Sequence, residues 1–248
     1  LAAFGIGNMV QANSVADALK ATFDLPTWMT GVVLVVLTAM VILGGIKSIA
    51  SVTQWLVPFM AVLYLGGAVI VLALCAGKLP HVFKLIFDGA FSGTAAVGGF
   101  AGSTMMLALR YGIARGLFSN EAGLGSAPMV HCAADTDHPV RQGMYGVFEV
   151  FVDSLLICTA TALVILLTDT WNSGLTGAAL SVKAFETGLP GTFGDVVVTG
   201  GLVLFAYSTL LGWSYYGETG IVYLLGAKAA MPYRLAWLVY VFLGATGS

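Results

Sequence analysis

Ser119-Asn-Glu-Ala-Gly-Leu-Gly125 is a polar, glycine-containing stretch in the middle of an apolar run from Ser103 to about Ala134. A charge at the bilayer centre costs about 2.5 to 3.5 kcal/mol on insertion scales, so Glu121 is expected to face protein or a cavity, with a partner or a proton. Gly123 and Gly125 favour unwinding, and irregular backbone at this depth is tolerated only inside protein or beside water. We therefore expect a crossing helix that is broken at this stretch.

The composition of the chain is that of a helical membrane protein. Of the 248 residues, 58% are hydrophobic and 9% are charged, whereas about 25% are charged in a typical soluble domain. Several stretches of about 20 residues carry almost no charge, which is the length a helix needs to cross about 30 Å of hydrocarbon. The net charge is -2 and the basic residues are scattered, so no nucleic-acid partner is expected. The sequence predicts one all-α, polytopic domain over residues 1–248, surrounded by the lipid bilayer.

Seven crossing segments are expected, and the one that contains residues 119–125 is broken. The other six are predicted at about residues 1–19, 27–46, 52–76, 139–167, 196–218 and 233–243. Lys47 and Ser48 are interpreted as a link, residues 81–100 as an interfacial helix and loop, and residues 177–186 as a short amphipathic helix. Because Leu1 opens inside an apolar run and Ser248 follows another, we expect the chain to be a fragment.

A break in a crossing helix exposes two helix ends to a ligand. The N-terminus of one half attracts a carboxylate, and the carbonyl end of the other half attracts a cation. A zwitterionic amino acid carries both charges, so Ser119, Asn120 and Glu121 are candidate binding residues. The alternative is a glycine-lined helix contact with one structural carboxylate.

The first predicted span carries Asn8, Gln11 and Asn13, which cannot all share one face of a helix and need different partners. Gln11 or Asn13 could reach a substrate, while interhelical hydrogen bonds are the competing interpretation for each. Asp153, beside Ser154 in an apolar helix, is either a functional residue or the structural partner of a neighbouring helix.

Residues 205–218 contain adjacent hydroxyls at Ser208 and Thr209, which are hard oxygen ligands suited to sodium. Hydroxyls in membrane helices also bond the carbonyl four residues earlier, so this local interpretation stays open. Trp213 could close a small cavity, or it could pack as an ordinary aromatic residue.

An enzyme or a channel is a weaker interpretation of the same residues. His131, Asp135, Asp137 and His138 have metal-ligand side chains, but their place at a helix end before Pro139 is explained by capping, and no transition-metal site is expected. An intramembrane hydrolase would need more than Ser126 and His131, which lack an evident orienting third group. An ion channel would favour a continuous pore over a broken helix with paired charge sites.

Five stretches taken together closely resemble the alanine or glycine:cation symporter family, within the amino acid-polyamine-organocation type superfamily. They are Gly7-Asn-Met-Val-Gln-Ala-Asn-Ser14, Gly44-Gly-Ile-Lys-Ser-Ile49, Arg115-Gly-Leu-Phe-Ser-Asn-Glu-Ala-Gly-Leu-Gly-Ser-Ala127, His138-Pro-Val-Arg-Gln-Gly143 and Ser208-Thr-Leu-Leu-Gly-Trp-Ser-Tyr-Tyr-Gly-Glu218. The resemblance implies an inverted-repeat fold of five plus five helices in the cytoplasmic membrane of a prokaryote. The chain would hold about the third to the ninth helix.

The resemblance also implies a function and a set of site residues. It implies sodium-coupled symport of a small neutral amino acid, alanine or glycine, by alternating access, with Na⁺ as coupling ion and no other cofactor. The substrate would be held by Ser119, Asn120, Glu121, Ala122 and Gly123, with Gln11, Asn13 and Trp213 in the pocket. Ser208 and Thr209 would bind sodium, together with groups from a helix outside this chain.

Overall fold

A computed structural model describes residues 3–91, 106, 109–114, 116–117, 119–121, 125–189 and 193–247. The described residues form helices and turns, with no strand among them, which confirms the all-helical class. The chain divides into two compact units, Leu1–Gly67 with Ser173–Ser248, and Ala68–Asn172. Each unit is described by itself.

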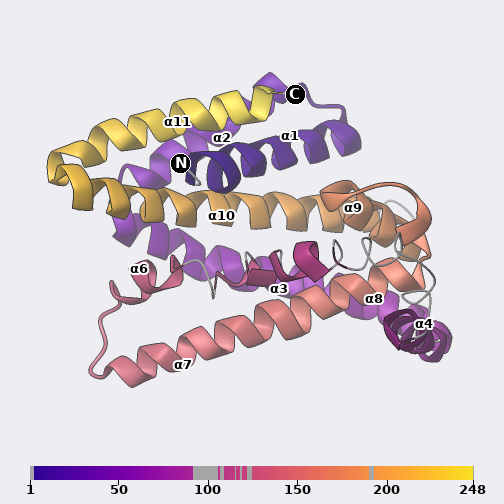
Figure 1. Ribbon diagram of the computed structural model, residues 1–248. Coiled ribbons are helices and arrows are strands. Elements are labelled where there is room, and N and C mark those ends of the chain that lie inside the picture. Colours follow the sequence, from indigo (N-terminus) through magenta and orange to yellow (C-terminus); the bar gives the residue numbers. More distant parts are fainter. Residues whose placement is uncertain are drawn as a thin grey trace. The chain divides into compact units, whose positions relative to one another are not determined.

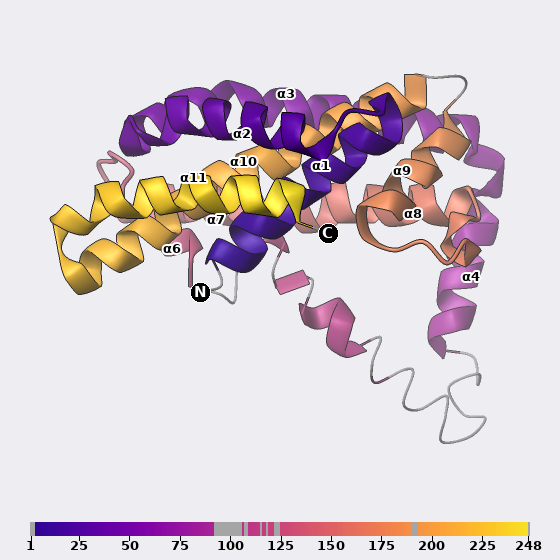
Figure 2. The same ribbon diagram turned by 90° about the horizontal axis from the view of Figure 1, so that it is seen from above.

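The first unit is a bundle built from both ends of the chain. Its helices are η1 (Ala3–Met9, a π-helical turn), α1 (Val10–Phe23), α2 (Thr27–Ile42), the first part of α3 (Gly45–Leu74), α9 (Gly177–Gly188), α10 (Phe193–Leu225), η6 (Ala227–Ala229) and α11 (Ala230–Thr246). α11 packs against α2 and α1, and α1 packs against α10 (Figure 1). α10 and α11 form a hairpin, and α1 passes them obliquely when seen from above (Figure 2).

An aromatic cluster fixes the start of the chain to α11. The ring of Phe4 lies 5.2 Å from that of Tyr233, 5.6 Å from that of Trp237 and 4.7 Å from that of Tyr240, measured between centroids. Trp237 is fully buried. Because tilted aromatic pairs contribute about 0.5 to 1.5 kcal/mol beyond the area that they bury, the cluster holds η1 in a defined position.

The second unit contains one long helical rod. α7 (Pro139–Val150), η4 (Phe151–Cys158, π-helical) and α8 (Thr159–Leu167) follow one another without a break (Figure 1). α6 (Ala127–His131) packs against α7, and α4 (Leu79–Phe91) packs against α8. The last part of α3 and two 3₁₀ turns, η2 (Ala76–Lys78) and η5 (Thr170–Asn172), complete the described elements.

The start of the rod was predicted from its sequence, and the prediction is confirmed. Pro139 occupies the first helical position, where its missing N–H removes no helical hydrogen bond. The Nδ1 atom of His138 accepts a hydrogen bond from the Val140 N–H at 3.2 Å. His138 is therefore the N-cap residue of α7, and its side chain makes the capping hydrogen bond.

Within the described residues, two helices are long and apolar enough to cross a membrane, Gly45–Leu74 and Pro139–Leu167. α2 is a shorter apolar helix. The first of the two includes Pro58 in its interior, as predicted. Thr27–Ile42 and Ala230–Thr246 lie close to predicted segments, whereas the predicted crossing at residues 103–134 lies largely outside the described residues.

Two predicted boundaries are wrong. Lys47 and Ser48 lie inside α3, and the link is at Leu43 and Gly44, before Gly45 with its φ of +71°. A left-handed φ is available to glycine at little steric cost, so the chain turns there rather than at the charged residue. α10 continues past residue 218 to Leu225, so Glu218 lies inside the helix, where its carboxylate pairs with Arg234 of α11.

Candidate functional site

The predicted break is present in the described part of the segment. Residues 116–117 and 119 are helical, Asn120 and Glu121 leave the helix, and α6 begins at Ala127. Glu121 has a φ of +56°, in the left-handed region that non-glycine residues rarely adopt. Such backbone conformations cluster at functional sites. Two of the predicted substrate residues, Ala122 and Gly123, lie outside the described residues.

Two side-chain hydrogen bonds join the break to the rod. The Ser119 hydroxyl donates to Asp153 Oδ2 at 2.7 Å, and the Asn120 amide donates to Ser154 Oγ at 2.8 Å. We call these four residues the 119/153 clamp. Two consecutive residues of the broken segment thus bond to two consecutive residues of the rod. The partner of Asp153 therefore lies in the broken segment.

The acceptors of the clamp lie on a π-helical turn, η4. π-Helical turns are rare and are often found at functional sites. Asp153 and Ser154 are both half-buried. The sequence identified Asp153 as a candidate, but it carried no signal for the π-helical geometry.

Glu121 has the partner that its position requires. The Ser126 hydroxyl donates to Glu121 Oε2 at 2.9 Å, so this hydrogen bond bridges the residues of the break. Since Ser126 directs its proton at a carboxylate, it is not oriented as a nucleophile toward an imidazole. His131 instead contacts Gln142 and Glu149.

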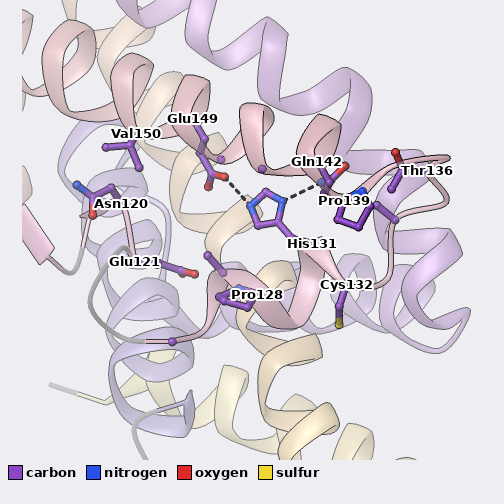
Figure 3. Close-up of a pocket in the computed structure, with 15 residues that line it drawn as sticks. Asn120, Glu121, Pro128, His131, Cys132, Thr136, Pro139, Gln142, Glu149 and Val150 are labelled. Carbon is purple, nitrogen blue, oxygen red and sulfur yellow. Dashed lines mark hydrogen bonds and ion pairs between the residues drawn. The ribbon is translucent and has the colours of Figure 1, made fainter.

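Beyond the break lies a cavity of about 650 Å³. Its polar lining includes Asn120, Glu121, His131, Gln142 and Glu149, and Figure 3 shows Glu121 and Glu149 extending toward α6 from two sides. The cavity therefore adjoins the residues predicted to hold the substrate.

His138 and Asp137, in the loop before α7, have partners in α7 itself. His138 caps α7, and Arg141 pairs with Asp137 at 3.3 Å. Among the described residues, no three His, Cys, Asp or Glu side chains gather closely enough to hold one metal ion.

In the first unit, the three amides of the first helix have three different partners, as their spacing predicted. Asn8, which is fully buried, donates to the Trp237 carbonyl at 3.0 Å. Gln11 donates to the Ile6 carbonyl at 3.3 Å, within its own helix. Asn13 donates to the Gly247 carbonyl at 2.9 Å, which is the interhelical contact that the alternative interpretation expects.

Trp213 of α10 packs directly on the turn to which Gln11 bonds. It is 9% exposed, and its ring makes an edge contact with Tyr216 at 5.6 Å between centroids. A Cβ atom placed on Gly7 would lie 2.5 Å from Trp213 Cγ. Only glycine permits this approach, so η1 and Trp213 form one packed unit.

Ser208 and Thr209 both donate to the Phe205 carbonyl at 2.9 Å. This is the local bonding that the alternative interpretation expected. Each hydroxyl oxygen still has lone pairs, since a hydroxyl that donates one hydrogen bond also accepts. Ser208 Oγ also lies 3.6 Å from Met60 Sδ, which places it beside α3.

One polar contact was missed by the sequence analysis. Arg234 forms a two-pronged ion pair with Glu218, with Nε to Oε2 at 2.7 Å and Nη2 to Oε1 at 2.5 Å. Its Nη1 also donates to the Leu43 carbonyl at 3.0 Å, next to the α2–α3 link. The sequence did contain a signal for this contact, since Glu218 and Arg234 carry opposite charges at the adjacent ends of two consecutive predicted spans.

A comparison with known protein families shows which family the chain belongs to. The model of the sodium:alanine symporter family matches residues 1–248. The chain therefore belongs to this family of transporters, which also makes it part of a membrane protein.

Several relatives match nearly the whole chain. The sodium/alanine symporter AgcS of Methanococcus maripaludis is 48% identical over 100% of the chain and 54% of its own length. The sodium/proton-dependent alanine carrier protein of Bacillus sp. (strain PS3) is 37% identical, over 95% of the chain and 56% of its own length. The probable sodium/glutamine symporter GlnT of Bacillus subtilis is 38% identical, over 97% of the chain and 50% of its own length. The chain thus spans about half the length of these relatives.

Proposed function

We propose that the whole protein is a sodium-coupled symporter of a small neutral amino acid, alanine or glycine. The observation that carries the proposal is the broken helix at residues 119–126, whose polar residues are clamped to Asp153 and Ser154 in a member of this family. A carrier for a zwitterion needs groups for an ammonium and a carboxylate at one place. The proposed location is a prokaryotic cytoplasmic membrane.

The substrate is proposed to bind at Ser119, Asn120, Glu121, Ala122 and Gly123. Support comes from the left-handed Glu121, which frees backbone groups that a continuous helix would use. Asp153 acts through Ser119 and is a positioning residue. Gln11, Asn13 and Trp213 are proposed as further substrate residues because the resemblance to the family implies that role.

Sodium is proposed to bind at Ser208 and Thr209. Hydroxyl oxygens are hard ligands, and the two hydrogen bonds to the Phe205 carbonyl orient both oxygens while leaving lone pairs for a cation. Two hydroxyls do not complete a coordination shell, so further ligands must come from other groups of the whole protein.

The proposed mechanism is alternating access in a fold of two inverted five-helix repeats, of which this chain holds about helices three to nine. Inward movement of one sodium ion supplies about 2.3 kcal/mol per 100 mV of membrane potential, in addition to its concentration gradient. Small substrates would be selected by clashes with the pocket walls, because each extra buried methylene changes affinity by only about 0.8 kcal/mol.

The test is alanine and glycine uptake into proteoliposomes that contain the full-length protein, with and without an inward sodium gradient. We expect saturable, sodium-dependent accumulation of one or both amino acids. The double variant Ser208→Ala/Thr209→Ala should raise the sodium concentration needed for half-maximal uptake, with Ser14→Ala as control, since Ser14 also bonds its own helix, at the Val10 carbonyl. Uptake that does not depend on sodium would contradict the coupling, and non-saturable flux would indicate a channel.

A further inference from the structure

His131 joins α6 to α7 through both of its ring nitrogens. Nδ1 lies 2.8 Å from Gln142 Nε2, and Nε2 lies 3.3 Å from Glu149 Oε2 (Figure 3). With the Gln142 amide in this orientation its nitrogen donates, so Nδ1 accepts and the neutral imidazole carries its hydrogen on Nε2. That hydrogen points at the Glu149 carboxylate.

The same three side chains also accommodate a protonated imidazole. His131 would then donate from both nitrogens, and Gln142 would accept after its amide turns by 180°. The hydrogen bond to the Glu149 carboxylate would then gain a positive donor and become an ion pair, which in a partly exposed site adds about 1 kcal/mol or less. Histidine ordinarily changes charge between about pH 5 and 8. The contact is partly exposed, with 26% of the His131 side chain and 55% of the Glu149 side chain accessible, so a proton has access.

This contact is mechanically linked to the candidate substrate residues. α6 has five residues, with His131 at its end and Ser126 directly before its start. Ser126 donates to Glu121, and Asn120 and Glu121 line the cavity that also contains His131 and Glu149. Whatever fixes α6 on α7 therefore also limits the movement of Ser126 and Glu121.

Among the described residues, the other titratable groups near His131 lie in the cavity lining, in the loop before α7 and in the first turn of α7. Those that line the same cavity are Glu121, Cys132 and Glu149. The loop and the first turn of α7 add Asp135, Asp137, His138 and Arg141, of which Asp137 and Arg141 pair with each other and His138 caps α7. Within the described residues, His131 is the imidazole that faces both α7 and the cavity.

We propose that His131 and Glu149 form a proton-binding site that fastens α6 to α7 when His131 is protonated, and so slows transport at acid pH. This inference rests on the proposed symport for its transport readout. Protonation strengthens the His131–Glu149 contact, and the fastened α6 holds Ser126 and Glu121 in one arrangement. Substrate turnover then falls.

The first readout is alanine uptake by the full-length protein in proteoliposomes at several pH values from 5.5 to 8.0. The pH is equal on both sides and the sodium gradient is fixed, so the driving force is constant. Wild type should lose several-fold in maximal rate between pH 8.0 and pH 5.5. His131→Gln should have a flat profile, and Glu149→Gln, which removes the charge but keeps an acceptor, should be flattened as well.

The matched control is His81→Gln, which removes an exposed imidazole from α4. It should keep the wild-type profile. If wild type and His131→Gln have the same pH profile while sodium-dependent uptake is intact, the proton-site inference is wrong and the proposed function stands. If wild type has no sodium-dependent uptake at any pH, the proposed function fails.

The second readout does not require transport. Backbone hydrogen exchange of residues 127 and 129–131, corrected for the intrinsic pH dependence of exchange, should be slower at pH 5.5 than at pH 8.0 in wild type. The difference should disappear in His131→Gln and Glu149→Gln and persist in His81→Gln. Equal protection at both pH values in wild type would overturn the proton site, whatever the uptake result.

Discussion

The 119/153 clamp and the Arg234–Glu218 pair are both polar contacts between helical segments, but they are built differently. The clamp consists of two single hydrogen bonds between half-exposed or exposed groups, and one end of it is the left-handed break at Glu121. The Arg234–Glu218 pair is two-pronged, and its side chains are only 16% and 17% exposed. A single hydrogen bond constrains two segments less than a two-pronged, mostly buried ion pair does.

The difference in burial and geometry predicts a difference in energetic cost. Removing one partner of a buried ion pair leaves an uncompensated charge, which costs about 3 to 5 kcal/mol. Removing one hydrogen bond to a partly exposed charged group costs about 1.5 to 3 kcal/mol at most. We therefore expect variants of the pair to affect stability and variants of the clamp to affect transport.

The largest expected effect is that of Arg234→Met. It should lower the free energy of unfolding by about 3 kcal/mol at most, because Glu218 loses its two-pronged partner while its side chain is only 17% exposed. Denaturant unfolding of the full-length protein in mild detergent measures it. The control Arg141→Met breaks an exposed pair and should change stability by about 1 kcal/mol or less. Equal effects of the two variants would refute the distinction between buried and exposed pairs.

The next effect is that of Asp153→Asn on transport. The amide keeps an acceptor for Ser119 but loses the charge, so kcat/KM for alanine uptake should fall by about tenfold or more. The free energy of unfolding should change little. A variant that transports normally would show that Asp153 is only a structural partner of the break.

A smaller effect is expected at the Gly7–Trp213 contact. Gly7→Ala places a methyl group 2.5 Å from the indole ring and should destabilise the protein by about 1 to 3 kcal/mol through overpacking. Gly5→Ala, in the same π-helical turn, meets no atom within 4 Å and serves as the matched control. Thermal unfolding of both variants distinguishes them, and equal midpoints would contradict the close packing of Trp213.

The smallest effect concerns Asn13. If its hydrogen bond to the Gly247 carbonyl is its main role, Asn13→Ala should cost about 0.6 kcal/mol of stability and leave the KM for alanine unchanged. A large rise in KM at constant stability would instead identify Asn13 as a substrate ligand. Uptake kinetics over a range of alanine concentrations separate the two roles.

The sequence was sufficient to predict where the chain breaks and where most helices lie. Polar residues with glycines in an apolar run predicted the break at residues 119–125, and Pro139 after His138 predicted the start of α7. These signals are local, since they depend on helix propensity and on the cost of burying polar groups.

The sequence could not predict which polar side chains contact one another. Asp153 was ambiguous because nothing local indicates that η4 is π-helical or that Ser119 lies opposite it. Glu218 suggested a helix end because its partner, Arg234, is 16 residues away. The mistaken link at Lys47 has a similar cause, since charge suggested a loop where the backbone turn at Gly45 decides the boundary.

The most direct test of the account is a double-mutant cycle on the clamp, with Ser119→Ala, Asp153→Ala and the double variant. The quantity measured is kcat/KM for sodium-dependent alanine uptake by the full-length protein in proteoliposomes, with unfolding recorded alongside. We predict that the double variant loses no more than about the larger single loss, a coupling of about 1 kcal/mol or more, because both changes remove one hydrogen bond. Independent, additive losses, or losses that follow stability alone, would contradict the claim that Asp153 positions the broken segment for transport.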